Sequence, residues 1–509
     1  MSFRSILFDT PEAFQATAAH EEPASFRDLN LDQIVSSITT GREAYDLTPL
    51  FYEPVREVAT IRYRHEVFRD LGSRPLSLHL ASFARQMREV HGRRARAAKL
   101  YYARQAERYF VETMIIYCKA VKRLASDLTA ADLKSQGLRE AREFLVSYTG
   151  SKGFAALRAE AEQILTSLAA IRYSLVIHGA RIEVQSYEPE SDYGAEVLQT
   201  FEKFKQGAPQ EYSFKFRDSL EMNHVEAAIV DRVALLHPEV FSALSQYCVQ
   251  HRDWLDAGIA RFDREVQFYL AVLEHMEQLK PLPFCYPEVT ARSKETYARE
   301  AFDLALAYRL RGDKGRVVTN DFHLTDPERI LVISGANQGG KTTFARMFGQ
   351  LHYLASLGCP VPARDARVFL FDELFTHFEK QERVESLSGK LEDELLRMHR
   401  ILERVTSNSI LVMNESFGAT TLSDALFLSK EIFKQIIQRG MICVYVTFLD
   451  ELASLDRSTV SMVSTVDPTD PTIRTFKVIR QPADGLAYAL AIAQKYRLSY
   501  RDVKERIRS

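Results

Sequence analysis

The sequence has few cysteines and none of the paired spacings that indicate a disulfide framework or a zinc site. Its five cysteines are scattered over 509 residues without a CxxC pair, which fits reduced, mostly buried thiols. It also has no uninterrupted apolar run near the roughly 18 residues that span a bilayer. The apolar start of the chain is too short for a signal peptide. We therefore expect a soluble, cytoplasmic protein with no membrane partner.

The chain also lacks a net charge of either sign that would favour one class of partner. Its 66 Lys and Arg residues nearly balance 68 Asp and Glu residues, so any nucleic-acid-binding surface must be local. Isolated histidines such as His178, His224 and His399 have no partner at metal-ligand spacing. There is no internal repeat and no low-complexity linker. The length and the 46% hydrophobic content are enough for two to four domains.

Hydrophobic periodicity divides the chain into three parts. Residues 1–45 are low in periodicity and predict an irregular N-terminal arm. Residues 46–280 are mostly helical, with an excursion at about 173–217 that begins as a β-hairpin. Residues 281–509 alternate β-like and helical runs, with strands expected at 330–334, 368–371, 410–413 and 442–446. The fold class is thus multidomain: a mostly α-helical domain followed by an α/β domain with a parallel sheet covered on both faces.

One segment of the α/β part fits the phosphate-loop pattern GxxxxGK(S/T) at every fixed position. The strand at 330–334 leads into it and a helix follows, which is the context that this motif requires. Glycines let backbone N–H groups turn around a phosphate, and the helix N-terminus adds its positive dipole end. Lys341 would reach the β- and γ-phosphates, and the Thr342 hydroxyl would ligate Mg²⁺. The expected nucleotide-binding residues, for ATP or ADP, are Gly335, Ala336, Asn337, Gln338, Gly339, Gly340, Lys341, Thr342 and Thr343.

Hydrolysis also needs an acidic residue beside the phosphates, and two strand ends offer one. Asp372-Glu373 has the better local chemistry. Asn414-Glu415 has the better position, because ABC-type ATPases place a signature helix between the phosphate loop and the acidic strand. Leu387–Lys390 and the helical run after it occupy that place. We therefore expect Glu415 to be the catalytic base. Asp372 is left either as a sensor of the γ-phosphate and metal or as a solvated strand end.

Several segments together resemble the MutS family. They run over about residues 318–500 and comprise Val318–Asp321, the loop Gly335–Thr343 with its Asn337 and paired glycines, Leu357–Ala363, Asn414-Glu415 with Thr420, Thr421 and Asp424, and Asp484–Ala489. The resemblance implies an ABC-type ATPase domain with C-terminal helices at 281–509. It also implies a lever and core domain at 46–280, with a shortened clamp at about 173–217. No segment resembles the family's N-terminal mismatch-reading domain, so we expect no mismatch reading of that kind.

The resemblance also assigns roles to residues. It implies a homodimer through the ATPase domains, in which nucleotide bound by one subunit meets the signature segment of the other, namely Ser388, Gly389 and Lys390. Asn320 would face the adenine, and Asn414 would act on Mg²⁺ through water molecules. Gly389 and Ser388 remain alternatives for the family's signature serine.

Three departures from the family pattern concern hydrolysis. The aspartate expected before Glu415 is Asn414, the expected histidine after the last core strand is Phe448, and the signature serine has no unambiguous match. We therefore expect good ATP binding and slow turnover.

Basic and aromatic residues gather in one helical stretch. The candidate DNA contacts are Arg85, Arg88, Arg93, Arg94, Arg96 and Lys99. Such a stripe could follow a phosphate backbone, although it could equally be a solvated helix face with acidic neighbours. The favoured function is an ATP-dependent DNA-binding clamp or DNA-structure-handling ATPase in DNA repair or recombination. The alternative is a nucleotide-gated, protein-binding scaffold with little or no hydrolysis.

Overall fold

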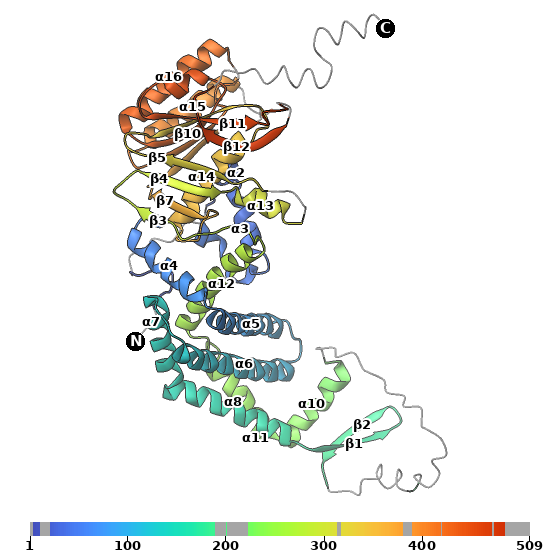
Figure 1. Ribbon diagram of the computed structural model, residues 1–509. Coiled ribbons are helices and arrows are strands. Elements are labelled where there is room, and N and C mark those ends of the chain that lie inside the picture. The colour runs from blue at the N-terminus through green and yellow to red at the C-terminus, as the bar shows by residue number, and fades with distance from the viewer. Residues whose placement is uncertain are drawn as a thin grey trace, which may run out of the picture. The chain divides into compact units, whose positions relative to one another are not determined.

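The computed structural model describes residues 4–10, 21–188, 200, 222–312, 317–379, 389–418, 420–470 and 473–483. The chain divides into two compact units (Figure 1). The first, here called the helical unit, comprises residues 1–3, 74–132 and 140–263. The second, the sheet unit, comprises residues 4–73, 133–139 and 264–509. The division differs from the boundary expected at residue 280, because residues 4–73 group with the α/β part.

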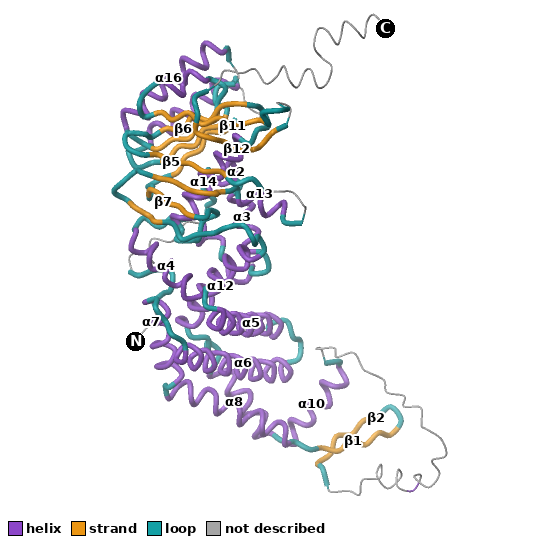
Figure 2. Tube along the Cα trace, in the orientation of Figure 1, coloured by secondary structure: helices purple, strands orange, loops and turns teal. Residues whose placement is uncertain are grey.

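Long helices with apolar residues at spacings of three and four build the helical unit (Figure 2). The helices that contribute to it are α5 (Arg74–Ala97), α6 (Ala103–Ala130), α7 (Gln136–Thr149), α8 (Lys152–Ala170), α10 (His224–Leu236), α11 (Pro238–Gln250) and the start of α12 (Ala257–Glu277). The expected hairpin is present as β1 (Tyr173–His178) and β2 (Arg181–Ser186), turning at Gly179 with φ +61°. The rest of the expected excursion, apart from residue 200, lies outside the described residues.

A six-stranded sheet organises the sheet unit, in the order β12-β11-β6-β10-β9-β8. Its strands are β6 (Ile330–Gly335), β8 (Leu374–Phe378), β9 (Ile410–Asn414), β10 (Ile442–Val446), β11 (Thr459–Val466) and β12 (Arg474–Arg480). All neighbouring pairs are parallel except β11 with β12. Because the carboxyl ends of the parallel strands meet at one edge, the loops after β6, β9 and β10 lie together there.

Both faces of this sheet are buried, as expected from its continuous apolar strands. Alternate residues of β6, β9 and β10 pack against α15 (Lys390–Arg404) and α16 (Leu422–Arg439) in one hydrophobic cluster. Helix α14 (Lys341–Ser356) contacts the same strands and belongs to the layer that also holds α2 (Phe26–Leu29). A four-stranded sheet, ordered β3-β7-β4-β5, completes the unit, with β3 (Glu288–Thr290), β4 (Thr296–Ala301), β5 (Asn320–Leu324) and β7 (Asp365–Phe369).

The strand expected at 368–371 requires a correction. It overlaps β7, which pairs with β3 and β4 in the four-stranded sheet and not with the phosphate-loop strand. The strand that lies beside β9 in the six-stranded sheet is instead β8, which starts immediately after Asp372-Glu373 and runs parallel to β9. Two strands separated by four residues therefore belong to two different sheets, a distinction that local sequence pattern cannot make.

The N-terminal segment is also more ordered than the irregular arm expected at 1–45. Helices α2 and α3 (Leu31–Thr39) precede α4 (Val58–Leu71), and the segment packs on α14. A Cβ on Gly349 would lie 2.6 Å from Leu29 Cδ2, and the Gln350 amide donates a 2.9 Å hydrogen bond to the Leu29 carbonyl. Phe51 is fully buried against Phe268, with ring centroids 4.9 Å apart, so it is a core aromatic.

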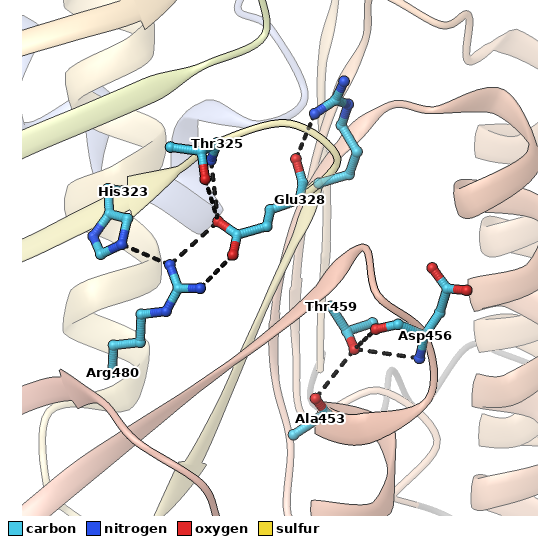
Figure 3. Close-up of polar contacts among 8 residues, drawn as sticks. His323, Thr325, Glu328, Ala453, Asp456, Thr459 and Arg480 are labelled. Carbon is cyan, nitrogen blue, oxygen red and sulfur yellow. Dashed lines mark hydrogen bonds and ion pairs between the residues drawn. The ribbon is translucent and has the colours of Figure 1, made fainter.

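An ion pair ties β12 to the loop before β6 (Figure 3). Arg480 contacts the Glu328 carboxylate, which also accepts hydrogen bonds from the Thr325 amide and hydroxyl at 3.1 and 3.2 Å. Arg480 Nη1 lies 2.6 Å from His323 Nε2 on β5. The last residue of β12 is thereby fixed near the start of β6, at the end of that strand opposite the phosphate loop. Within the described part of the chain, no helix is both long and apolar enough to cross a membrane.

Candidate nucleotide-binding site

The phosphate loop joins β6 to α14, as the motif predicts. Gly335 and Gly340 have φ values of +103° and +93°, a region that residues with side chains rarely adopt. A Cβ on Gly335 would lie 2.7 Å from the Ser464 carbonyl oxygen, and one on Gly339 would lie 2.7 Å from Ser464 Oγ. The loop therefore needs glycine both for its backbone conformation and for its close approach to β11.

Lys341 points its ammonium group into this loop. Its Nζ donates hydrogen bonds to the carbonyl oxygens of Gly335 at 2.9 Å and Ala336 at 3.2 Å, and to Asn337 Oδ1 at 3.3 Å. Burial lowers the pKa of Lys341, and the carboxylate of Glu415 opposes that shift. These three acceptors hold the ammonium group within the loop, at the place where phosphate oxygens would bind it.

Thr342 and Asn414 bring the ends of α14 and β9 together. The Thr342 hydroxyl donates to Asn414 Oδ1 at 2.9 Å, and Asn414 is buried. This hydroxyl and amide are both oxygen donors, which fits a magnesium ion that is held largely by phosphates and water. The pair carries no negative charge, so it would hold a magnesium ion less strongly than a pair with an aspartate at position 414. Among the described residues, no three His, Cys, Asp or Glu side chains form a separate metal-binding group.

A cavity of about 400 Å³ opens over the loop. Its phosphate end is lined by Gln338, Gly340, Lys341, Thr342, Thr343 and Glu415. Its other end is apolar and is lined by Leu306 and Leu310 of α13 (Leu304–Leu310), Val317, Val318 and Phe476, together with Asn320. A polar end with a lysine and an apolar end with an aromatic ring suit a nucleoside triphosphate.

Asn320 lines the cavity, but its amide is used to hold β12. Its Nδ2 donates to the Phe476 carbonyl at 3.2 Å, and its Oδ1 accepts from the Val478 amide at 2.7 Å. Phe476 has a φ of +57° and is half exposed. Asn320 thus fixes the backbone of β12 at Phe476 and Val478, and its contact with adenine stays a prediction. Sequence reasoning did not single out Phe476, which lines the cavity, because a lone aromatic in a strand carries no signal for a place in a binding site.

Phe448 follows β10 and lies beside the lysine. Its ring centroid is 4.6 Å from Lys341 Nζ, a cation–π contact, and its side chain is 52% exposed. The position expected to hold a histidine thus holds an aromatic ring against the phosphate-binding lysine.

The structure does not bring Asp372 to the phosphate loop. Its carboxylate accepts hydrogen bonds from the hydroxyls of Ser409, at 2.9 Å, and Thr406. Its backbone amide donates to the Asn408 carbonyl at 3.2 Å. Asp372 therefore lies where β8 and β9 begin, at the edge of the sheet opposite Glu415, and it holds a turn there. This placement removes the physical basis for a sensing role.

The signature segment is only partly described. Gly389 is the N-cap residue of α15, and Lys390 Nζ lies 2.5 Å from Glu379 Oε1, whereas Ser388 lies outside the described residues. Glu379 follows β8, and its amide donates to the Asn414 carbonyl at 3.3 Å. Sequence reasoning missed Glu379 because it missed β8.

The basic stripe lies on α5 and on the turn that follows it in the helical unit. Arg93 pairs with Glu89 at 3.1 Å and Glu112 at 3.6 Å, and Arg94 stacks over Trp254 at 5.5 Å. Arg88 is half-buried, whereas Arg85, Arg96 and Lys99 are exposed, as is Tyr101 at 89%. Part of the stripe therefore has intramolecular roles, and its exposed part gathers towards the turn after α5.

Comparison with known proteins locates one family. Residues 331–505 match the model of MutS domain V. "DNA mismatch repair protein MSH4" of Arabidopsis thaliana is 31% identical over 138 residues, 27% of this chain and 17% of that protein. "DNA mismatch repair protein MutS" of Thermotoga neapolitana is 30% identical over 141 residues, 28% of this chain and 18% of that protein. The MutS protein of Halalkalibacterium halodurans is 27% identical over 183 residues, 34% and 21% of the two chains.

These matches cover about a fifth of each relative, 17% to 21% of its length. The matched domain contains the phosphate loop from β6 onward, Asn414-Glu415 and β12. The site geometry and the similarity thus fall on the same residues. The C-terminal part of the chain, residues 331–505, is thus similar to MutS domain V.

Proposed function

We propose that the protein binds ATP with Mg²⁺ in the cavity above the phosphate loop and hydrolyses it slowly. The observation that carries the proposal is the convergence of Lys341, the Thr342–Asn414 hydrogen bond and Glu415 around one cavity. The apolar end, with Phe476, would receive the base, and the backbone amides of the loop would receive the phosphates.

Glu415 is the residue proposed to orient the attacking water. It follows β9, and its amide donates to the Val446 carbonyl at 2.9 Å, which fixes it at the carboxyl edge of the sheet. A bound magnesium ion would neutralise charge on the β- and γ-phosphates, with Thr342 as its protein ligand. Asn414 keeps an acceptor oxygen for Thr342 but not the negative charge. Slow turnover follows from that missing charge and from Phe448 in the place of a histidine.

We propose further that two copies associate through their ATPase domains, with the Gly389–Lys390 end of α15 facing the partner's nucleotide. The names of the relatives describe DNA mismatch repair, and the exposed Arg85, Arg96 and Lys99 offer a local basic surface. The favoured role is therefore an ATP-dependent clamp or DNA-structure-handling ATPase in DNA repair or recombination. The second candidate, a nucleotide-gated protein scaffold, is favoured by Asn414, by Phe448 and by the intramolecular pairing of Arg93 and Arg94.

Calorimetry with ATP and Mg²⁺ tests the nucleotide part of the proposal, and absence of heat with both ATP and ADP would overturn it. Fluorescence anisotropy with duplex, branched and single-stranded DNA across a salt series tests the DNA part. A steep salt dependence is expected, together with weaker binding by the double variant Arg96→Glu/Lys99→Glu. Lys119→Glu/Lys122→Glu, at exposed positions of α6, is the charge-matched control. If no DNA binds at low salt, the scaffold is the remaining candidate.

A further inference from the structure

The backbone that carries Glu415 is held in an unusual conformation. Glu415 and Phe417 have φ values of +52° and +65°, although neither is glycine. Residues with a side chain are strained in this region of φ and persist there only where the surrounding structure over-determines the backbone. Asn414–Phe417, here called the elbow, is therefore maintained by contacts other than its own.

Three side chains beneath the elbow supply these contacts. His377 Nδ1 lies 2.8 Å from Ser416 Oγ, the Tyr445 hydroxyl donates to the Ser416 carbonyl at 3.3 Å, and Glu394 Oε2 accepts the Phe417 amide at 2.9 Å. His377 Nε2 lies 3.2 Å from the Glu394 carbonyl. Because a carbonyl oxygen only accepts, His377 Nε2 carries a proton and donates to the Glu394 carbonyl.

Glu394 differs from the other two because it is a buried carboxylate. Its side chain is 5% exposed, and Oε1 has no hydrogen-bond partner within the described residues. Burial raises its pKa, while the Phe417 amide hydrogen bond opposes that shift. A buried, half-satisfied carboxylate is costly, and an apolar side chain would pack there at lower cost. The hydrogen bond to the elbow is the interaction that an apolar side chain could not make.

Glu394 also lies on α15, the helix that begins at the proposed partner-facing segment. It is four residues after Lys390, where α15 begins, and α15 is the helix proposed to face the partner's nucleotide. We infer that Glu394 is a positioning residue that ties α15 to the elbow and thereby sets the orientation of Glu415. The inference deepens the proposed function, on which the role of Glu415 rests. A displacement of α15 would move the acceptor of the Phe417 amide, so helix position and base orientation are linked.

Two substitutions separate this role from simple packing. Glu394→Leu removes the acceptor, and Glu394→Gln keeps an oxygen that can accept the amide. Glu392→Leu and Glu392→Gln, at an exposed position of the same helix, are the controls. The measurements are hydrogen exchange of the Phe417 amide, ATP turnover, ATP affinity and melting temperature.

In Glu394→Leu, we expect Phe417 exchange to rise about 10-fold and turnover to fall about 10-fold, because one hydrogen bond to a charged group is lost. ATP affinity should stay within about 2-fold, because the phosphate loop does not depend on that hydrogen bond. In Glu394→Gln, both the exchange of the Phe417 amide and the ATP turnover should stay close to their wild-type values. Unchanged exchange in Glu394→Leu, or equal losses in both variants, would overturn the inference. If the wild-type protein hydrolyses no faster than Glu415→Gln, the proposed hydrolysis fails, while exchange still decides whether Glu394 holds the elbow.

Discussion

The two sides of the nucleotide site differ in how closely they keep the chemistry that a P-loop ATPase needs. On the capture side, Gly335, Gly340 and Lys341 have the required backbone and charge, and Lys341 already holds three acceptors in the loop. On the hydrolysis side, Asn414 lacks a charge and Phe448 lacks an imidazole. Capture depends on backbone amides and one lysine, whereas hydrolysis depends on particular side chains. A chain can therefore lose efficient hydrolysis and still bind nucleotide.

The largest expected effect concerns the capture side. Lys341→Ala should weaken ATP affinity about 1,000-fold, because charge-assisted hydrogen bonds to two phosphates contribute about 1.5–3 kcal/mol each. Titration calorimetry measures the affinity. Lys434→Ala, an exposed lysine of α16 paired with Glu431, should leave it unchanged. An affinity within a few-fold of wild type in Lys341→Ala would show that the loop does not hold the phosphates.

Acidification should lower the stability of the folded protein through His352, which lies on α14, the helix that also carries Lys341. His352 is fully buried, and burial lowers its pKa from 6.5 to about 4. Between these values the unfolded chain binds the proton and the folded one does not, so stability falls as pH falls below about 6.5. The loss is complete below about pH 4 and amounts to about 3 kcal/mol for this residue.

Urea unfolding at pH 7 and pH 5 measures how much the free energy of unfolding falls with pH. Because His65 and His275 are also buried with a pKa of about 4, the comparison must be made with His352→Gln, which should lose less stability in acid than the wild type. Equal slopes in the two proteins would mean that His352 does not contribute to the acid sensitivity of α14.

Asn414→Asp tests whether the missing charge limits hydrolysis. Aspartate keeps the oxygen that accepts from Thr342 and restores a negative charge beside the metal, so turnover should rise about 10-fold, near the range for one positioned charge in a partly buried site. Steady-state phosphate release measures it. The gain should disappear in Asn414→Asp/Glu415→Gln. If turnover falls instead, Asn414 is needed as an amide.

The same contrast describes how much could be predicted from the sequence. The phosphate loop was predictable because its function depends on adjacent residues in one turn, and the structure has the expected strand, loop and helix. The MutS resemblance was confirmed by the domain V match. By contrast, Phe476 lines the cavity from β12, and Glu379, after β8, and Glu394, on α15, contact the backbone of the elbow. Their positions depend on which strands pair and which helices pack beside them.

The errors have the same origin. Val368–Phe371 and Leu374–Phe378 are two short segments of neighbouring sequence, and only tertiary pairing assigns the first to one sheet and the second to another. That assignment moves Asp372 to the edge opposite Glu415. The N-terminal segment was expected to be irregular, yet α3 buries apolar residues at helical spacing, namely Leu31, Ile34, Val35 and Ile38. Leu29 packs directly against Gly349 of α14.

The smallest expected effect concerns Phe448, where the two sides of the site meet. Its ring stabilises the Lys341 ammonium in the nucleotide-free protein, and such a contact contributes about 0.5–1 kcal/mol at an exposed site. If Lys341 must leave the Phe448 ring to contact the phosphates, Phe448→Leu removes the competing contact. The variant should then bind ATP about 3-fold more tightly, as measured by calorimetry. Phe427→Leu, an exposed phenylalanine of α16, should have no effect. Weaker binding in Phe448→Leu would instead mean that the ring contacts bound nucleotide, and Phe448 would then belong to the capture side.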